Sequence, residues 1–191
     1  IGDASLMIDR IATLEAAAPT HIAFVANPRY RAHLATTRAG CVIVAPALPG
    51  DIIMWPVTDR TVYLQSGSYL ASPESIDIDS KWGGAKTFFS KEGLFMLKCT
   101  GTGDLVVSSY GAVHAVDLAP GQSYTVDTGH MVGWEEGVGY EVAKAGSWKS
   151  TLFGGEGLVV KLTGPGRVYI QTRSPSDFID WIVPKLPTQR A

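Results

Sequence analysis

A repeat within the chain is the sequence feature that most restricts its fold. Three short segments recur about 62 to 64 positions later: residues 65–71 match 127–133, residues 89–94 match 153–158, and residues 100–103 match 163–166. Each copy reads as strand, glycine-containing turn, strand, a stretch with Trp and Lys, a Glu-Gly-Leu strand and a Gly-x-Gly hairpin. Such a unit cannot cover its own apolar face. We therefore expect the copies, at about residues 62–109 and 124–173, to pack around a shared core with pseudo-symmetry.

Composition divides the 191-residue chain near Leu48. The first 48 residues hold 12 Ala and 2 Gly, whereas the other 143 hold 8 Ala, 19 Gly and all five Trp. One uniform fold rarely has two such compositions. We therefore expect two parts, a short α/β-like segment over residues 1–48 and a β domain over residues 49–191.

The larger part is expected to be mainly β. Short runs of β-branched and aromatic residues alternate with glycine-rich turns, and helical periodicity is nearly absent outside residues 176–183. The runs lie at residues 61–65, 76–79, 105–108, 138–142 and 167–171. This spacing predicts a pseudo-symmetric β-sandwich or prism of repeated β units.

The first part alternates short apolar stretches with helix formers. Residues 21–25 and 41–44 have the composition of buried strands, and residues 29–38 have that of a helix. Asn27-Pro28 is a turn signal, because proline disfavours the helical conformation of the residue before it. Strand, helix and strand in this order predict a small α/β unit.

Charge and apolar runs argue against polyanions and membrane spans. Sixteen basic against eighteen acidic residues give a net charge of −2, and residues 49–191 carry 12 against 15. We therefore expect no nucleic-acid partner. No apolar run approaches the roughly 18 residues of a membrane span, and no signal-like start is present. Cys41 and Cys99 lie in apolar surroundings without a CxxC spacing, so we expect reduced thiols and a cytoplasmic location.

Two groups of residues in the β part could be imagined as chemical sites. His114 and Asp117, and then Asp127 and His130, are each three residues apart, but positions three apart on a strand point to opposite faces. Glu92 and Glu156 are equivalent in the two copies, which favours a turn or strand edge over acid–base catalysis. We predict no catalytic residue, no metal site and no cofactor.

The aromatic residues of the two copies leave two alternatives open. They lie beside lysines in matching segments: Trp82, Phe88, Phe89, Trp148 and Phe153. An exposed cluster of this kind would suit contact between subunits, and a buried one would be core.

Residues 24–31, Phe-Val-Ala-Asn-Pro-Arg-Tyr-Arg, with His33-Leu34 and the strand at 39–44, resemble the N-terminal domain of UDP-3-O-acylglucosamine N-acyltransferase, a lipid A biosynthesis enzyme. The resemblance implies that Phe24, Asn27 and Tyr30 contact the uracil of a UDP-sugar. Two aromatic faces can sandwich a base, and an amide can match its imide edge. The alternative is that Phe24 belongs to the core and Asn27-Pro28 is only a turn. The hexapeptide repeats of that family's catalytic part do not follow Leu48.

Residues 49–191 resemble the bacterial relatives of the altered-inheritance-of-mitochondria protein family. The segments that carry this resemblance are residues 49–53, 92–95, 109–112, 126–130, 156–159 and 164–173. The family is similar in fold to the tryptophan RNA-binding attenuation protein and consists of three related β units with pseudo-threefold symmetry. The resemblance implies a non-enzymatic homo-oligomer with no established biochemical activity. The alternative function is that of an acyltransferase-related, UDP-sugar-binding fragment.

The two resemblances meet between Ala45 and Gly50 without a linker. Only two of the three β units are visible, and residues 1–48 stand where the first would be. This junction is typical of a chimera of two fragments. A misassigned first β unit over residues 1–48 would produce the same pattern.

Overall fold

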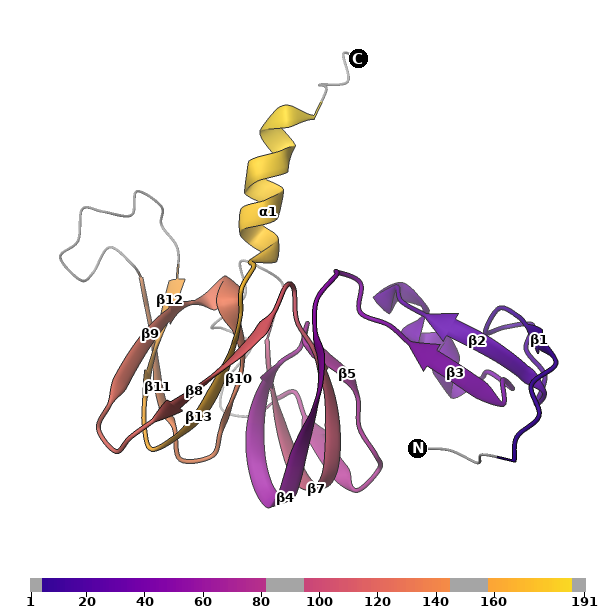
Figure 1. Cartoon of the computed structure of the whole chain (residues 1–191), viewed down its shortest axis with the longest axis horizontal. Coiled ribbons are helices and arrows are strands. Elements are labelled where there is room, and N and C mark those ends of the chain that lie inside the picture. Colours follow the sequence, from indigo (N-terminus) through magenta and orange to yellow (C-terminus); the bar gives the residue numbers. More distant parts are fainter. Residues whose placement is uncertain (1–4, 82–94, 145–157, 187–191) are drawn as a thin grey trace. The chain divides into compact units, whose positions relative to one another are not determined.

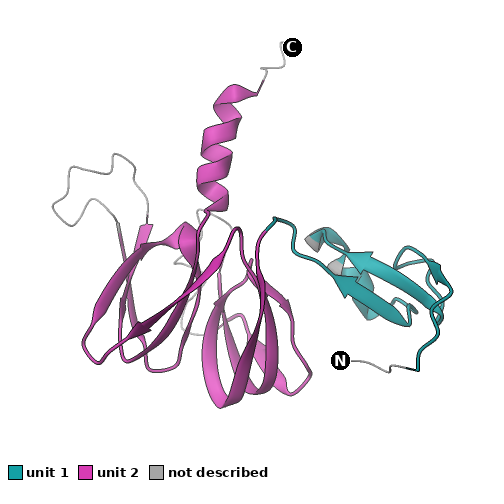
Figure 2. Cartoon of the chain, viewed as in Figure 1, with its two compact units in different colours: residues 1–49 teal, residues 50–191 magenta. Residues whose placement is uncertain are grey.

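The computed structural model describes residues 5–81, 95–144 and 158–186 and divides the chain into two compact units, Ile1–Pro49 and Gly50–Ala191 (Figures 1 and 2). The mainly β fold predicted from the sequence is confirmed. None of the helices within the described ranges is long and apolar enough to span a lipid bilayer.

The first unit is a small parallel sheet. It has the strand order β1-β2-β3, with β1 over Arg10–Ile11, β2 over His21–Val25 and β3 over Cys41–Val44. The strands predicted at 21–25 and 41–44 are confirmed, but the segment between them is a 3-10 helix, η1, over Pro28–Ala35. The unit has its own core of Leu14, Ala23 and Val25, against which Ala39 and Val42 pack.

The second unit begins with a long, bent antiparallel pair, β4 (Ile52–Gln65) and β7 (Met96–Ser108). Between them in the chain come β5 (Tyr69–Ala71) and β6 (Ile76–Asp79). Strand β6 pairs with the first half of β7, and β5 pairs with the second half. The two halves of β7 therefore have different strands on the side away from β4.

Within the described residues, six strands and three short helices follow. The strands are β8 (Val113–Leu118), β9 (Ser123–Asp127), β10 (Met131–Glu135), β11 (Gly139–Lys144), β12 (Leu158–Thr163) and β13 (Gly166–Gln171). The 3-10 helix η3 (Thr128–His130) connects β9 to β10. The helix α1 (Pro175–Ile182) and the 3-10 helix η5 (Val183–Lys185) follow β13. The helix lies close to the predicted helical stretch at 176–183.

The pairing pattern of β4 to β7 recurs in β8 to β13. Strand β8 pairs with β13 as the first half of β4 pairs with the second half of β7, and β9 pairs with β12 as the second half of β4 pairs with the first half of β7. Strand β11 pairs with β12 as β6 pairs with the first half of β7. Strand β10 on β13 corresponds to β5 on β7. Both of these pairs carry a register shift, between Met131 and Gly133 and between Tyr69 and Ala71. Strands β4 to β7 and strands β8 to β13 are called here the two halves of the second unit. Even their register shifts correspond.

The glycine-rich stretches are bends and not the predicted hairpin turns. Strand β7 continues through Gly101–Gly103, and the chain leaves one sheet for another between β12 and β13. Gly103 and Gly166, which correspond in the two halves, have φ angles of 152° and 140°, a conformation that side chains disfavour. A Gly-x-Gly pattern supplies this freedom to a bend as well as to a hairpin, so local sequence does not separate the two.

The two halves share one sheet. Strand β4 pairs with β10, which gives the order β5-β7-β4-β10-β13-β8, and a second sheet has the order β11-β12-β9. Two core clusters result, one centred on Trp55 and the other on Trp134. Each cluster also contains a residue from the other half: Val132 of β10 lies in the Trp55 cluster, and Met96 of β7 lies in the Trp134 cluster.

Candidate functional site

A cleft of about 460 Å³ lies beside the start of α1. Three aromatic side chains form part of its wall: Tyr110 after β7, and Phe178 and Trp181 on α1. The ring of Phe178 lies edge-on to that of Tyr110, with 6.2 Å between centroids, and is 6.2 Å from that of Trp181. The other lining residues are polar: His130, Thr172, Arg173, Ser174 and Asp177.

The cation of this cleft, Arg173, is held in place by its neighbours. Its guanidinium carbon lies 5.6 Å from the centroid of the Tyr110 ring, in cation–π geometry. Its aliphatic stem lies so close to Gly111 that a Cβ there would come within 3.1 Å of Arg173 Cγ. The backbone N–H of Arg173 donates to Tyr110 O at 3.2 Å. The side chain therefore has defined neighbours, and Arg173 as a residue is exposed.

His130 and Asp177 join α1 to the sheet. The His130 Nε2 atom lies 3.7 Å from Asp177 Oδ2, and its Nδ1 atom lies 2.8 Å from the Gln171 carbonyl oxygen. Ser174 caps the helix, because its Oγ accepts a hydrogen bond from the Asp177 N–H at 3.2 Å. Both ring nitrogens of His130 thus face partners other than a serine hydroxyl. This arrangement suits anchoring of the helix rather than activation of a nucleophile.

Helix α1 exposes most of its apolar side chains. Phe178, Ile179 and Trp181 of α1 are 41 to 58% exposed, as are Val183 and Leu186 after it, and no residue of the helix is buried. A helix that is apolar on most of its circumference is normally covered by other protein. This C-terminal segment therefore carries several exposed apolar side chains close together in the sequence.

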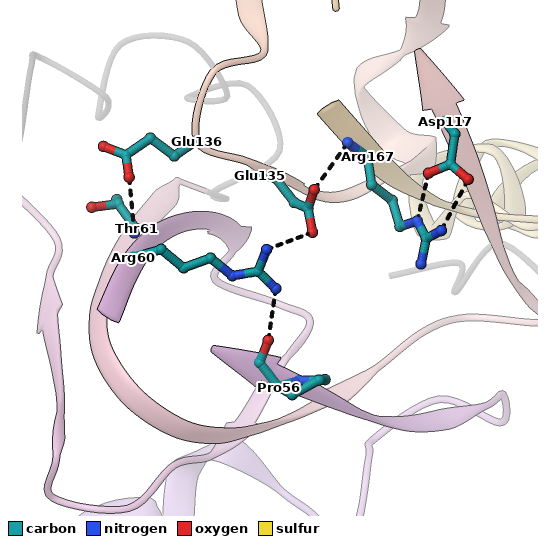
Figure 3. A network of polar contacts seen from close by, with 7 residues as sticks. All are labelled: Pro56, Arg60, Thr61, Asp117, Glu135, Glu136 and Arg167. Atoms are coloured by element: carbon teal, nitrogen blue, oxygen red, sulfur yellow. Dashed lines mark hydrogen bonds and ion pairs between the residues drawn. The ribbon is translucent and has the colours of Figure 1, made fainter. Parts of the chain in front are cut away.

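A row of alternating charges crosses four neighbouring strands (Figure 3). Arg60 of β4 donates from Nη1 to Glu135 Oε1 of β10 at 3.1 Å, and the Arg167 backbone N–H of β13 donates to Glu135 Oε2 at 3.2 Å. Arg167 Nε and Nη2 then donate to the two oxygens of Asp117 of β8 at 2.6 and 2.9 Å. Each charge of the row has an opposite charge on a neighbouring strand, which adds a favourable cross-strand pair to the sheet.

The four residues considered for a metal site have separate roles. Asp117 pairs with Arg167, and Asp127 Oδ1 accepts from the Gly129 N–H at 2.8 Å. His130 contacts Gln171 and Asp177, and His114 lies exposed in β8 opposite Ile170. Glu92, Glu156, Trp82, Trp148, Phe88, Phe89 and Phe153 fall outside the described residues.

The residues predicted to contact uracil all lie exposed in the first unit. Phe24 of β2 is 53% exposed and Tyr30 of η1 is 52% exposed, so the alternative that places Phe24 in the core is wrong. Asn27 caps η1, because its Oδ1 accepts from the Arg29 N–H at 3.0 Å. The Tyr30 ring lies 6.0 Å from the ring of His33. Two unburied aromatic faces and one amide are therefore available in this unit.

The two cysteines differ in environment. Cys99 of β7 is fully buried, and its burial, with Asp77 nearby, raises the pKa of the thiol to about 12. Cys41 of β3 is half-buried. A thiol with so high a pKa is a poor nucleophile, so Cys99 serves the core.

The sequence did not indicate the cleft beside α1. Tyr110 and Arg173 are 63 positions apart and meet because β13 ends beside the loop after β7, where Thr172 N donates to Ala112 O at 3.0 Å. The signal that could have been used is the run from Phe178 to Leu186, which is apolar at most positions and lies outside the repeat.

Two groups of known proteins are similar to this chain, one over most of its length and the other over a short segment. An uncharacterised protein of Streptococcus pyogenes serotype M6 is 27% identical over 151 residues, which are 78% of this chain and 60% of the relative. A crystal structure of a Streptococcus pyogenes protein superposes with a TM-score of 0.61 at 27% identity, and covers 74% of this chain and 63% of that one.

The second group of similar proteins matches only a short segment. UDP-3-O-acylglucosamine N-acyltransferase of Leptothrix cholodnii is 59% identical over 51 residues, and that of Polaromonas naphthalenivorans is 51% identical over 47. These matches cover 27% and 25% of this chain but 15% and 13% of the enzymes. The chain thus spans less than two thirds of any of these relatives.

The family model described as Mitochondrial biogenesis AIM24 matches residues 7–173, which include strands β1 to β13. The chain therefore belongs to the AIM24 mitochondrial biogenesis family.

Proposed function

We propose that this chain is a non-enzymatic β protein that forms homo-oligomers through its second unit. The single observation that carries the proposal is the exposed apolar surface of α1 and η5, formed by Ile179, Trp181, Val183 and Leu186. Contiguous apolar side chains at a protein surface mark contact sites.

The recurring strand pairings support a repeated architecture. We propose that β4 to β7 and β8 to β13 are two copies of one β unit, related by the pseudo-threefold arrangement of the family. Corresponding pairs share their register shift, at Tyr69 to Ala71 and at Met131 to Gly133. The two free thiols, Cys41 and Cys99, support a cytoplasmic location.

Light scattering coupled to size exclusion at micromolar concentration tests the oligomer. We expect a mass that is a multiple of the 20.4 kDa chain. Replacing Ile179 and Leu186 by Ser should shift the mass toward the monomer, because hydroxyls reduce the apolar area that association removes from water. The matched control is Met54→Ser, which alters a side chain of similar exposure on β4. A monomeric wild-type chain would refute the proposal.

A second candidate function is favoured by the first unit. We propose that Phe24, Asn27 and Tyr30 bind the uracil of a UDP-sugar, as the resemblance to the acyltransferases implies. The exposure of both rings supports this proposal, since neither is consumed by the core. The Oδ1 atom of Asn27 caps η1, so its Nδ2 amino group is the part available to donate a hydrogen bond to a base oxygen.

Titration of the chain with UMP, followed by NMR or calorimetry, tests this second function. We expect binding that Phe24→Ala weakens strongly, because one face of the base loses its stacking partner. The matched control is Leu34→Ala, which removes an exposed apolar side chain from the same unit. Equal binding by the two variants would exclude a base site at Phe24.

A further inference from the structure

The cleft beside α1 contains a cation without an acidic partner. Within the described ranges, Arg173 forms no ion pair, although Arg60 and Arg167 each do. Its guanidinium rests on the Tyr110 ring and its stem on Gly111, so little conformational freedom remains to be lost on binding. A guanidinium in this state can offer two parallel N–H groups to a carboxylate.

The other charged groups of the cleft are engaged. Asp177 lies 3.7 Å from His130, and the first turn of α1 is already capped by the Ser174 hydroxyl. The Asp177 N–H in the first turn of α1 is therefore not available to bind an anion. Because Asp177 remains in the wall, an anion with a single charge fits better than a dianion such as a phosphate.

The aromatic walls specify the rest of the ligand. Tyr110, Phe178 and Trp181 present ring faces or edges around one opening, and the two successive ring pairs are each 6.2 Å apart. Rings pack on such walls by offset stacking or edge contact. A cleft of about 460 Å³ is within the usual range for small-molecule sites, roughly 300–1,000 Å³.

We propose that this cleft binds an aryl monocarboxylate. The carboxylate pairs with the Arg173 guanidinium, and the ring packs among Tyr110, Phe178 and Trp181. The ligand enters beside α1 and does not require the apolar side chains of Ile179, Val183 and Leu186. The site shares Trp181 with the surface proposed for assembly but includes none of the residues of the uracil site in the first unit.

Calorimetric titration with 2-naphthoate tests the site, with 2-naphthylmethanol as the uncharged analogue. We expect 2-naphthoate to bind more tightly than the alcohol, and Arg173→Gln to weaken its binding at least about tenfold, the effect of losing a charge-assisted pair. The alcohol should bind the variant and the wild type alike. The matched control is Lys185→Gln, which removes a cation that is positioned over the Trp181 ring but does not line the cleft.

Two results would overturn the proposal. One is the absence of 2-naphthoate binding at millimolar concentration. The other is equal affinity of 2-naphthoate for the wild type and Arg173→Gln, which would mean adsorption to the apolar face of α1 alone. Thermal unfolding of each variant verifies the fold. Trp181→Leu provides a second variant, and it should weaken binding of both probes because the ring contact is lost.

Discussion

The ring of Tyr63 in β4 stacks on the ring of Trp134 in β10, with 5.6 Å between centroids and 29° between planes. Tyr169 of β13 packs in turn on Trp55 of β4, 4.5 Å away. Each core cluster therefore receives a tyrosine from the other half of the second unit. This exchange couples the two halves, so we expect them to unfold together.

Replacing Trp134 by Leu tests this coupling. The indole is fully buried, and its truncation should lower the free energy of unfolding by about 3 kcal/mol. Circular dichroism in urea should still show one transition, because loss of one cluster withdraws support from the other. Tyr124→Leu, which alters a tyrosine packed on the same cluster from β9, is the milder control. Two separate transitions in the Trp134 variant would show that the halves are independent.

The pKa of Tyr63 is raised from 10.0, mainly by burial and further by the charges of Glu136 and Tyr140. The folded chain therefore holds the phenolic proton more tightly than the unfolded chain does. This contribution is fully present below pH 10 and is lost as the pH rises through the raised pKa. Urea titrations at several alkaline pH values should show a smaller loss of stability in Tyr63→Phe than in the wild type. Equal pH dependence would contradict this expectation.

Asp117 has a lowered pKa, because Arg167 donates two hydrogen bonds to its carboxylate and adds a favourable charge. Replacing Arg167 by Gln should raise the Asp117 pKa toward its ordinary value of 3.8. The stability that this pair adds is present above the ordinary pKa and is lost as the pH falls through the lowered one. NMR titration of the carboxyl carbon measures the shift. Lys98→Gln, at a cation of β7, should leave it unchanged.

Gly133 of β10 has no room for a side chain. A Cβ there would overlap the Tyr63 carbonyl oxygen and lie 2.9 Å from the Trp55 ring. Gly133→Ala should therefore lower the free energy of unfolding by about 2 kcal/mol or more, as measured by urea denaturation. At Gly139, whose nearest neighbour is 3.7 Å away, Ala should have little effect. Similar losses at both sites would show that the β4 to β10 junction yields to the methyl group.

The contacts of Gly133 explain one sequence difference between strands β4 to β7 and strands β8 to β13. Gly133 corresponds to Ala71 in β5, and among the described strands β5 pairs only with β7. No strand of the described chain approaches Ala71 as β4 approaches Gly133. The recurring sequence segments therefore predict where strands lie. The difference between Gly133 and Ala71 depends instead on whether the strand edge at that position is paired with another strand.

The strand positions were predictable because their alternation and β-branched residues are local properties, as at 76–79 and 167–171. The cleft was not, because Arg173 and Tyr110 meet only through pairing at the end of β13. In the first unit, the sequence around Phe24 is equally compatible with a buried or an exposed ring. Exposure depends on what packs against β2, which no local pattern contains.

The thiols provide a last prediction. Burial raises the Cys99 pKa to about 12, whereas Cys41 is half-buried. At neutral pH a disulfide reagent should modify Cys41 readily, but Cys99 only when the core opens, because the thiolate is the reactive form and Cys99 is shielded. Cys41→Ser isolates the slow reaction, and its rate should increase with urea. A Cys99 that reacts as fast as Cys41 in the native protein would mean that β7 opens without global unfolding.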